Sequence, residues 1–150
     1  MAQSLSNILL HIVFSTKHRQ PFIDETIERE LFKYLATACN TLGCPTHGMG
    51  AADDHIHIAC TLARTVTVSK LIQELKQDSS HWMKQQGAAY ADFAWQNGYG
   101  AFSIGQSQLE DLQRYIANQR DHHRRESFED EFRRLLAKYE IDADERYLWD

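Results

Sequence analysis

The sequence lacks long apolar runs, and this absence excludes a membrane-spanning helix. No stretch of about eighteen consecutive apolar residues occurs among its 150 residues. The N-terminal residues also show no positively charged segment followed by an apolar stretch, which a secretory signal peptide requires. We therefore expect a cytoplasmic protein.

Cysteine is scarce as well. Cys39, Cys44 and Cys60 are odd in number, and no two of them have the Cys-x-x-Cys spacing. Disulfides are rare in reducing compartments, so we interpret these residues as small, buried apolar side chains. We expect neither a zinc framework nor a disulfide framework.

The overall composition is that of a globular protein. Hydrophobic residues make up 43% of the chain and charged residues 25%, which is typical of a soluble domain. A chain of this length can bury one adequate core. We therefore expect residues 1–150 to form a single domain.

The net charge of -5 argues mildly against a nucleic-acid partner, but the charge is unevenly distributed. Residues 126–150 hold nine acidic and four basic residues, so twelve of each remain among residues 1–125. The acidity therefore belongs to the C-terminal segment, and the rest of the chain can still present a basic surface. The cluster of basic residues around Tyr115 is either such a surface or a solvated helix face. Its members are Arg114, Arg120, Arg124 and Arg125.

The residue pattern predicts the order β-α-β-β-α-β followed by two further helices. This order is the ferredoxin-like (RRM-like) pattern, an α+β fold in which an antiparallel sheet carries two helices on one face. The third helix would open at the capping box that begins at Ser107, and the fourth at a similar signature that begins at Ser127. We expect strands at about 5–15, 45–51 and 55–62, and a strand pair or one kinked strand at 93–104. We expect helices at 24–42, from Thr65 or Thr67 to about 86, and from 107 and 127.

Two histidines on the third predicted strand form the first candidate site. Side chains on a strand alternate between faces, so His55 and His57 point one way while Ile56 and Ile58 point into the core. The first and third strands are central in this topology, so the histidines would project from the face that the first two helices leave uncovered. Two imidazoles at this spacing can bind one metal ion. The alternative is a half-buried strand whose polar face happens to carry two histidines.

The third predicted helix would cover this face. Tyr115 and Gln119 are four residues apart and therefore share one side of a helix. With this side over the histidines, His55, His57 and the Gln119 amide oxygen would bind a divalent metal ion and leave positions open for phosphate oxygens. The Tyr115 hydroxyl would attack a phosphodiester and become covalently joined to phosphorus. The alternatives are a half-buried structural tyrosine and a surface glutamine.

Other polar residues are secondary candidates. By alternation Asp53 falls on the face of the two histidines and is a reserve metal ligand. His11 could point toward the site from the neighbouring strand. His122 and His123 are expected to lie in a polar turn between helices.

Five segments, together with the closing residues 144–149, resemble the single-tyrosine HUH transposases of bacterial insertion sequences. They also resemble the relatives of these enzymes that are associated with repetitive extragenic palindromes (REP). Each segment is weak alone, but their order and joint presence are specific, and they extend over nearly the whole chain. The matching segments are HIVFSTKHR (11–19), DHIH (54–57), VSKLIQELK (68–76), WQNGYGAFS (95–103) and YIANQ (115–119).

The resemblance implies a DNA transposase that cleaves and rejoins single-stranded DNA carrying subterminal hairpins. His55 and His57 would bind Mg²⁺ or Mn²⁺, Gln119 would complete the metal site, and Tyr115 would form a 5'-phosphotyrosine and leave a 3'-hydroxyl. It further implies a homodimer in which each tyrosine helix serves the histidines of the partner. By the same analogy, five basic residues would contact DNA phosphates: Lys17, Arg19, Lys76, Arg114 and Arg120.

The sequence leaves two other functions open. A non-cleaving module that binds single-stranded nucleic acid would stack bases on exposed aromatic side chains of the central strands, whereas this face offers histidines. A hydrolase would use His55, His57 and Asp53 to activate water, and it would cut DNA without Tyr115.

Overall fold

The computed structural model describes residues 2–150 and contains one antiparallel sheet with the strand order β2-β3-β1-β4. Its strands follow the chain in the predicted β-α-β-β-α-β order, which confirms the ferredoxin-like α+β fold. The strands are β1 (Leu9–Ser15), β2 (Thr46–Ala52), β3 (His55–Thr61) and β4 (Gly100–Ile104).

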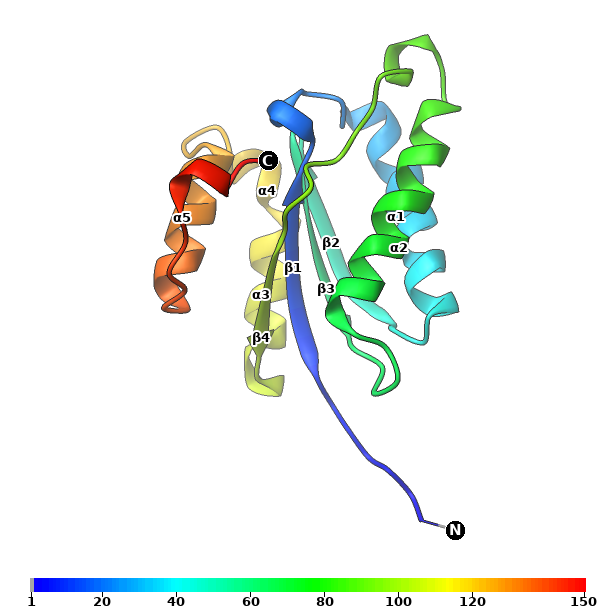
Figure 1. The fold of residues 1–150 in the computed structure, drawn as a ribbon, viewed down its shortest axis with the longest axis vertical. Coiled ribbons are helices and arrows are strands. Elements are labelled where there is room, and N and C mark those ends of the chain that lie inside the picture. The colour runs from blue at the N-terminus through cyan, green and yellow to red at the C-terminus, as the bar shows by residue number, and fades with distance from the viewer. Residues whose placement is uncertain (1) are drawn as a thin grey trace.

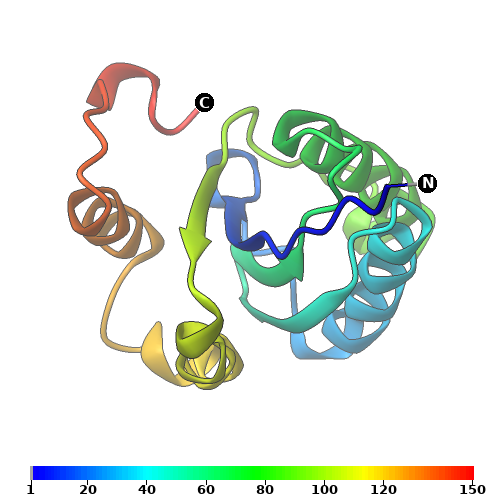
Figure 2. The ribbon, with the colours of Figure 1, turned by 90° about the horizontal axis from the view of Figure 1, so that it is seen from below.

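Two long helices, α1 (Glu25–Thr41) and α2 (Val68–Lys84), lie side by side on one face of the sheet (Figures 1 and 2). Each begins at a side-chain cap. Asp24 Oδ1 accepts a hydrogen bond from Ile27 N at 2.9 Å, and Thr67 Oγ1 accepts one from Lys70 N at 3.1 Å. These caps satisfy backbone donors that would otherwise lack partners, so the helices start where the sequence predicts.

The central strands are buried on both faces. Every residue of β1 is buried, and alternate residues such as Ile12 pack with Ile56 and Ile58 of β3 under α1 and α2. The remaining residues of these strands, including His57, face the opposite layer. The sheet therefore separates an apolar core from a second layer that contains the histidines.

Three shorter helices build that second layer: α3 (Leu109–Ala117), α4 (Gln119–His122) and α5 (Phe128–Lys138). They lie on the side of the sheet opposite α1 and α2 (Figures 1 and 2). Helix α3 packs mainly on β2 and β3. Helix α5 packs on β1 and β4 through a small apolar cluster, whose buried members are Val13, Phe102, Phe128, Phe132 and Leu135.

The structure corrects three details of the predicted elements. Ser107 caps no helix; instead the Gln108 side chain accepts a hydrogen bond from Gly105 N, and a short 3-10 turn precedes α3. The tyrosine helix ends at Ala117, and Asn118 separates it from α4. The aromatic segment at 93–104 forms only the short strand β4 and one isolated bridge, because its first half runs as a loop.

The C-terminal residues pack against the body of the protein. The Trp149 ring lies 6.0 Å from that of Phe132, centroid to centroid, and Arg19 donates a hydrogen bond to the Trp149 carbonyl at 3.0 Å. The backbone N–H groups of Asn97 and Gly98 donate to the Asp150 carbonyl. Among residues 2–150, no helix is both long and apolar enough to cross a bilayer.

We expect Gly50→Ala to destabilise the fold by about 1–3 kcal/mol, because overpacking a tight interface forces backbone shifts. A Cβ atom at Gly50 would overlap the backbone carbonyl of Ile116, at the end of α3. Gly105→Ala is the control, since its Cβ would meet only the Gln108 side chain at 3.7 Å. Urea denaturation measures both changes. Equal unfolding free energies for the two variants would contradict close packing of α3 on β2.

Candidate functional site

The site begins with three histidines that share one face of the sheet. His55 and His57 alternate with the buried Ile56 and Ile58 on β3, and all of β3 except its last residue is buried. In the antiparallel register, Val13 of β1 lies opposite His57. His11, two residues earlier on β1, therefore shares the face of His57, and it points toward the site as the sequence predicts.

The Nδ1 atoms of the two β3 histidines have separate partners. His55 Nδ1 lies 2.7 Å from Asp54 Oδ1, and His57 Nδ1 lies 2.7 Å from His11 Nε2. Such outer hydrogen bonds orient imidazole rings and set which nitrogen faces a ligand. Both rings thereby turn their Nε2 atoms toward the same point.

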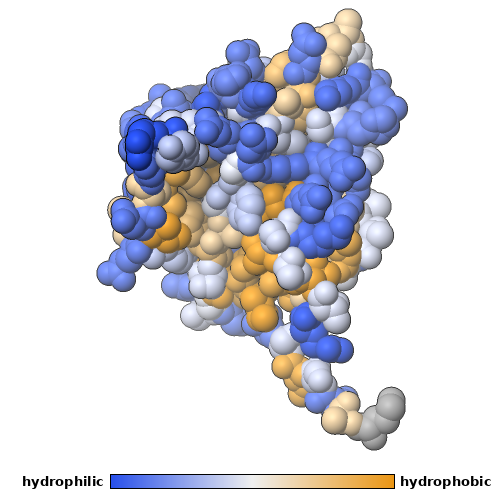
Figure 3. Space-filling model, in the orientation of Figure 1, coloured by the Kyte–Doolittle hydropathy of each residue, from blue (hydrophilic) through white to orange (hydrophobic). Residues whose placement is uncertain are grey.

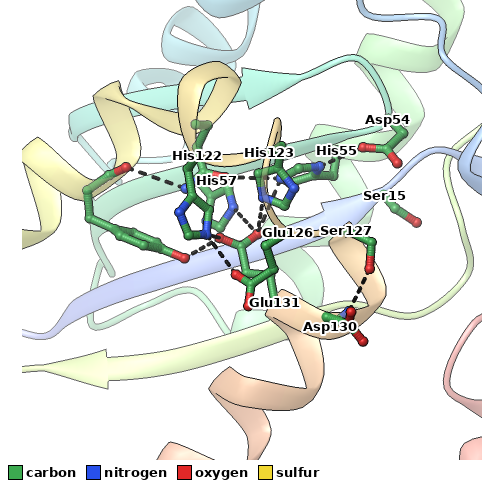
Figure 4. Close-up of polar contacts among 12 residues, drawn as sticks. Ser15, Asp54, His55, His57, His122, His123, Glu126, Ser127, Asp130 and Glu131 are labelled. Carbon is green, nitrogen blue, oxygen red and sulfur yellow. Dashed lines mark hydrogen bonds and ion pairs between the residues drawn. The ribbon is translucent and has the colours of Figure 1, made fainter.

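A carboxylate that the sequence analysis missed lies at this point. Glu131 of α5 is fully buried, and its Oε1 atom lies 3.0 Å from His57 Nε2 and 2.8 Å from His123 Nε2. His55 Nε2 is 3.3 Å away. Figure 4 shows these imidazoles gathered around the Glu131 side chain. One signal was available in the sequence: Glu131 follows Phe128 by three positions and so falls within the apolar stripe of its helix.

Tyr115 and Gln119 reach the same cluster from the other side. The Tyr115 ring lies 5.9 Å from the His57 ring, centroid to centroid, and its hydroxyl donates a hydrogen bond to Glu131 Oε2. Gln119 is buried, with its Oε1 atom 3.1 Å from His55 Nε2. The four residues predicted for the catalytic centre therefore meet within one chain, although the helix breaks between Tyr115 and Gln119.

Burial and charge shift the protonation equilibria of this cluster in opposite directions. Burial lowers the pKa of His57 to about 4. It acts the same way on His55, but hydrogen bonds and negative charge from Asp54 and Glu131 outweigh it and raise that pKa to about 9. Burial acts to raise the pKa of Glu131, yet hydrogen bonds from the imidazoles hold it well below its usual range. The cluster thus contains an ionised carboxylate that requires nearby positive charge.

The hydroxyl of Tyr115 is held in its protonated form. Burial and the hydrogen bond to Glu131 raise the pKa of Tyr115. Arg134 opposes this shift, because its Nη2 donates to the Tyr115 oxygen at 2.8 Å. The guanidinium is therefore positioned to stabilise negative charge on that oxygen.

The donor atoms of the cluster suit a divalent cation. One ligand atom from each of four residues lies within 4.8 Å of the others, and the residues are His55, His57, His123 and Glu131. Imidazole and carboxylate groups together suit first-row divalent ions, and the contact of His55 Nδ1 with the Asp54 carboxylate is one expected of a metal-bound histidine. The residues present therefore fit a metal site.

A cleft of about 260 Å³ leads to the tyrosine between α3, α5 and β4. Its walls include His11, Tyr115, Arg134 and Lys138. On the face of the molecule seen in Figure 1, hydrophilic side chains dominate the upper part, while apolar atoms reach the surface lower down (Figure 3). The cleft thus offers two basic side chains next to the half-buried phenol.

The five basic residues predicted to contact DNA occupy different settings. Arg19 bonds Ser15 and the Trp149 carbonyl, and Lys17 is exposed in the same loop. Lys76 donates to three backbone carbonyls at 2.7–3.1 Å, and burial lowers its pKa to about 8. Arg114 forms exposed ion pairs within α3. The predicted phosphate contacts of these residues stay predictions.

Arg120 ties α4 to the opposite layer. Its guanidinium bonds Glu28 Oε1 at 3.1 Å, Asp53 Oδ1 at 2.5 Å and the Ile23 carbonyl at 2.8 Å. Asp53 is therefore paired with an arginine and lies outside the histidine cluster, where the adjacent Asp54 contacts His55 instead. The position of Asp53 does not support its predicted role as a reserve metal ligand. It also does not support the alternative function of a hydrolase that uses Asp53 to activate water.

The alternative of a non-cleaving module that binds single-stranded nucleic acid also lacks structural support. A stacking module needs an open sheet face, but α3 and α5 cover the face that carries the histidines. His122 is the last residue of α4, so only His123 lies in the predicted turn between helices, and His123 turns inward and joins the cluster. The sequence pattern alone did not indicate this role.

The family profile described as "Transposase IS200 like" matches residues 4–119. The chain therefore belongs to the IS200-like transposase family, a class of DNA strand transferases, and the resemblance found in the sequence is confirmed. No curated protein is similar enough in sequence to count as a match.

Two solved structures share the fold. A candidate transposase from Deinococcus radiodurans has a TM-score of 0.63 and 16% identity, over 80% of this chain and 96% of that chain. A REP-associated tyrosine transposase bound to a REP hairpin has a TM-score of 0.56 and 14% identity, over 77% of this chain and 70% of that chain. At sequence identities of 16% and 14%, this structural similarity shows that the fold is shared.

We expect Arg120→Ala to lower the free energy of unfolding by about 1–2 kcal/mol, because partly buried charge-assisted hydrogen bonds are lost. Arg114→Ala removes only exposed ion pairs and should change the free energy of unfolding by less than about 0.5 kcal/mol. Chemical denaturation of both variants measures the difference. An unchanged unfolding free energy for Arg120→Ala would show that the Glu28 and Asp53 contacts do not hold α4.

Proposed function

We propose that this chain is a metal-dependent transposase that cleaves and rejoins single-stranded DNA through Tyr115. One observation carries the proposal: the Tyr115 hydroxyl lies in the same buried cluster as the Nε2 atoms of His55 and His57. A tyrosine nucleophile needs its hydroxyl beside the groups that would bind the metal ion, and this arrangement provides that.

His55 and His57 are the proposed metal ligands, and Gln119 lies close enough to add its amide oxygen. Bound Mg²⁺ or Mn²⁺ would polarise the scissile phosphodiester and neutralise negative charge on its oxygens. The chain itself orients these ligands through Asp54 and His11. Which of the two ions is used depends on availability as well as on the ligands.

Tyr115 is the proposed nucleophile. Its oxygen forms a bond to phosphorus while the bond from phosphorus to the 3'-oxygen breaks, which leaves a 5'-phosphotyrosine and a 3'-hydroxyl. Because the ester retains the energy of the broken bond, a DNA hydroxyl can reverse the step, and this reversibility suits cutting and rejoining. Arg134 supports the role, since it donates to the attacking oxygen.

The proposed substrate is single-stranded DNA with subterminal hairpins. The similar REP-associated transposase was solved with a REP hairpin, which supports a hairpin partner for this chain. The cleft with Arg134 and Lys138 is the proposed path of the strand to Tyr115. Additional phosphate contacts are proposed for the five basic residues expected from the sequence: Lys17, Arg19, Lys76, Arg114 and Arg120.

The assembly and location are proposals as well. Tyr115 lies beside the histidines of its own chain, which supports a site completed within one subunit. A homodimer, with or without exchanged tyrosine helices, stays a prediction. We propose that the protein acts on cytoplasmic, nucleoid-associated DNA.

We expect Tyr115→Phe to abolish the covalent protein–DNA adduct, because no other group can form the phosphotyrosine. The assay mixes the protein with Mn²⁺ and hairpin-bearing single-stranded DNA, and then resolves a slower protein band on a denaturing gel. Tyr147→Phe is the control, since Tyr147 is 67% exposed and lies in the C-terminal segment. Persistence of the adduct in Tyr115→Phe, or its absence from wild type with every hairpin end tested, would refute the proposed chemistry.

We expect Lys138→Ala to reduce the salt dependence of single-stranded DNA binding. Loss of one phosphate contact should lower the slope of log affinity against log salt by about 0.7. Fluorescence anisotropy at several salt concentrations measures the slope. Lys33→Ala on the opposite layer is the control, because Lys33 is exposed and paired with Glu30. The same slope in wild type and Lys138→Ala would mean that the strand does not pass through this cleft.

A further inference from the structure

Glu131 differs from the other carboxylates among residues 2–150, because it alone is fully buried. Burying an ionised carboxylate is costly unless charges and hydrogen bonds compensate for it. The neighbouring inward residues of α5, Phe128, Phe132 and Leu135, are apolar and would pack equally well beside an apolar residue. The position of Glu131 therefore requires an explanation beyond packing.

The two oxygens of Glu131 have different partners. Oε1 faces the Nε2 atoms of His57, His123 and His55 at 3.0, 2.8 and 3.3 Å. Oε2 accepts the hydrogen bond from the Tyr115 hydroxyl. One carboxylate thus connects the imidazole cluster to the phenol. Figure 4 shows it between the histidines of the sheet and the start of α5.

We propose that Glu131 is a metal ligand through Oε1 and the proton acceptor for Tyr115 through Oε2, with His123 as a further ligand. This inference rests on the proposed function, and it adds two ligands from outside the histidine pair. It also assigns a base to a reaction in which the phenol must lose its proton.

The hydrogen-bond pattern supports a cation between Glu131 and the imidazoles. Nδ1 of His55 is directed at the Asp54 carboxylate, so its Nε2 atom faces Glu131 and the other imidazoles. A buried carboxylate surrounded by imidazole Nε2 atoms needs a compensating positive charge, and a divalent cation bound between them would supply it. Ligands about 2.1 Å from a metal ion in octahedral geometry lie about 3.0 Å apart, which is close to the observed spacing around Oε1.

Gln119 is the weaker candidate for the third ligand. Its Oε1 atom lies 3.1 Å from His55 Nε2, and its amide nitrogen lies 3.4 Å from the Tyr115 carbonyl. A neutral amide compensates no ligand charge, whereas the Glu131 carboxylate brings a full negative charge to the cation. Gln119 is therefore expected to position the site more than to determine its affinity.

The proton transfer balances without any further reactant. Tyr115 passes its proton to Glu131 Oε2 as its oxygen bonds to phosphorus, and the bond from phosphorus to the 3'-oxygen breaks. The departing 3'-oxygen takes one proton from water and Glu131 returns its proton to water, so the number of protons is unchanged. Arg134, 2.8 Å from the phenol oxygen, stabilises the negative charge that develops there.

The test measures Mn²⁺ binding and adduct formation separately. The metal-free 150-residue protein is titrated with Mn²⁺, and free Mn²⁺ is followed by electron paramagnetic resonance. Glu131→Gln keeps the side-chain shape, and we expect it to weaken Mn²⁺ binding at least about tenfold. At saturating Mn²⁺ we expect adduct formation to slow by about 100-fold or more, because the proton acceptor is lost. Glu129→Gln makes the same change on the same helix and should behave as wild type.

His57→Ala separates this inference from the proposed function. Loss of Mn²⁺ binding in His57→Ala together with wild-type binding in Glu131→Gln would overturn the role of Glu131 and leave the proposed metal centre standing. Unchanged Mn²⁺ binding in both variants would reject the metal centre itself. If Glu131→Gln binds Mn²⁺ weakly but forms the adduct at the wild-type rate at saturating Mn²⁺, the role of Glu131 as proton acceptor would be overturned. Circular dichroism checks that each variant is folded.

Discussion

The second layer of this protein depends on one interaction, the contact of the buried Glu131 carboxylate with imidazoles from the sheet. Glu131 lies on α5, whereas His55 and His57 lie on β3, more than seventy residues earlier in the chain. The carboxylate can stay buried only while the imidazoles and the Tyr115 hydroxyl surround it. The polar site thus links α5, α3 and the sheet, and it also places the reactive groups next to one another.

The basic residues divide into two groups by their surroundings. Arg120 and Lys76 are engaged by carboxylates and backbone carbonyls, so they connect elements of the fold. Arg134 and Lys138 line the cleft beside Tyr115 and belong to the most acidic part of the sequence, and Arg134 is also paired with Glu126, whose Oε1 atom lies 2.9 Å from its Nη2. A segment with a net negative charge can therefore still present positive charge to a DNA strand where the strand would enter. Local placement matters more here than the total charge.

Local patterns predicted the first layer of the fold well. Alternating apolar residues define β1 and β3, and Asp24 caps α1, because these features depend on side chains that are close in sequence. Predictions were less accurate where a local signal competed with packing. The break at Asn118 interrupts a helix whose residue pattern continues, and only a short part of the aromatic segment at 93–104 pairs with β1.

The sequence by itself determined the family, the ferredoxin-like order of elements and the candidate residues His55, His57, Tyr115 and Gln119, because their spacing is a local property. Only the tertiary structure decided which distant groups join them. Glu131 and His123 enter the cluster because α5 folds back over β1 and β4, and Asp53 leaves it because Arg120 is nearby. No spacing rule within one element contains that information, since contacts between separate elements depend on how their faces pack.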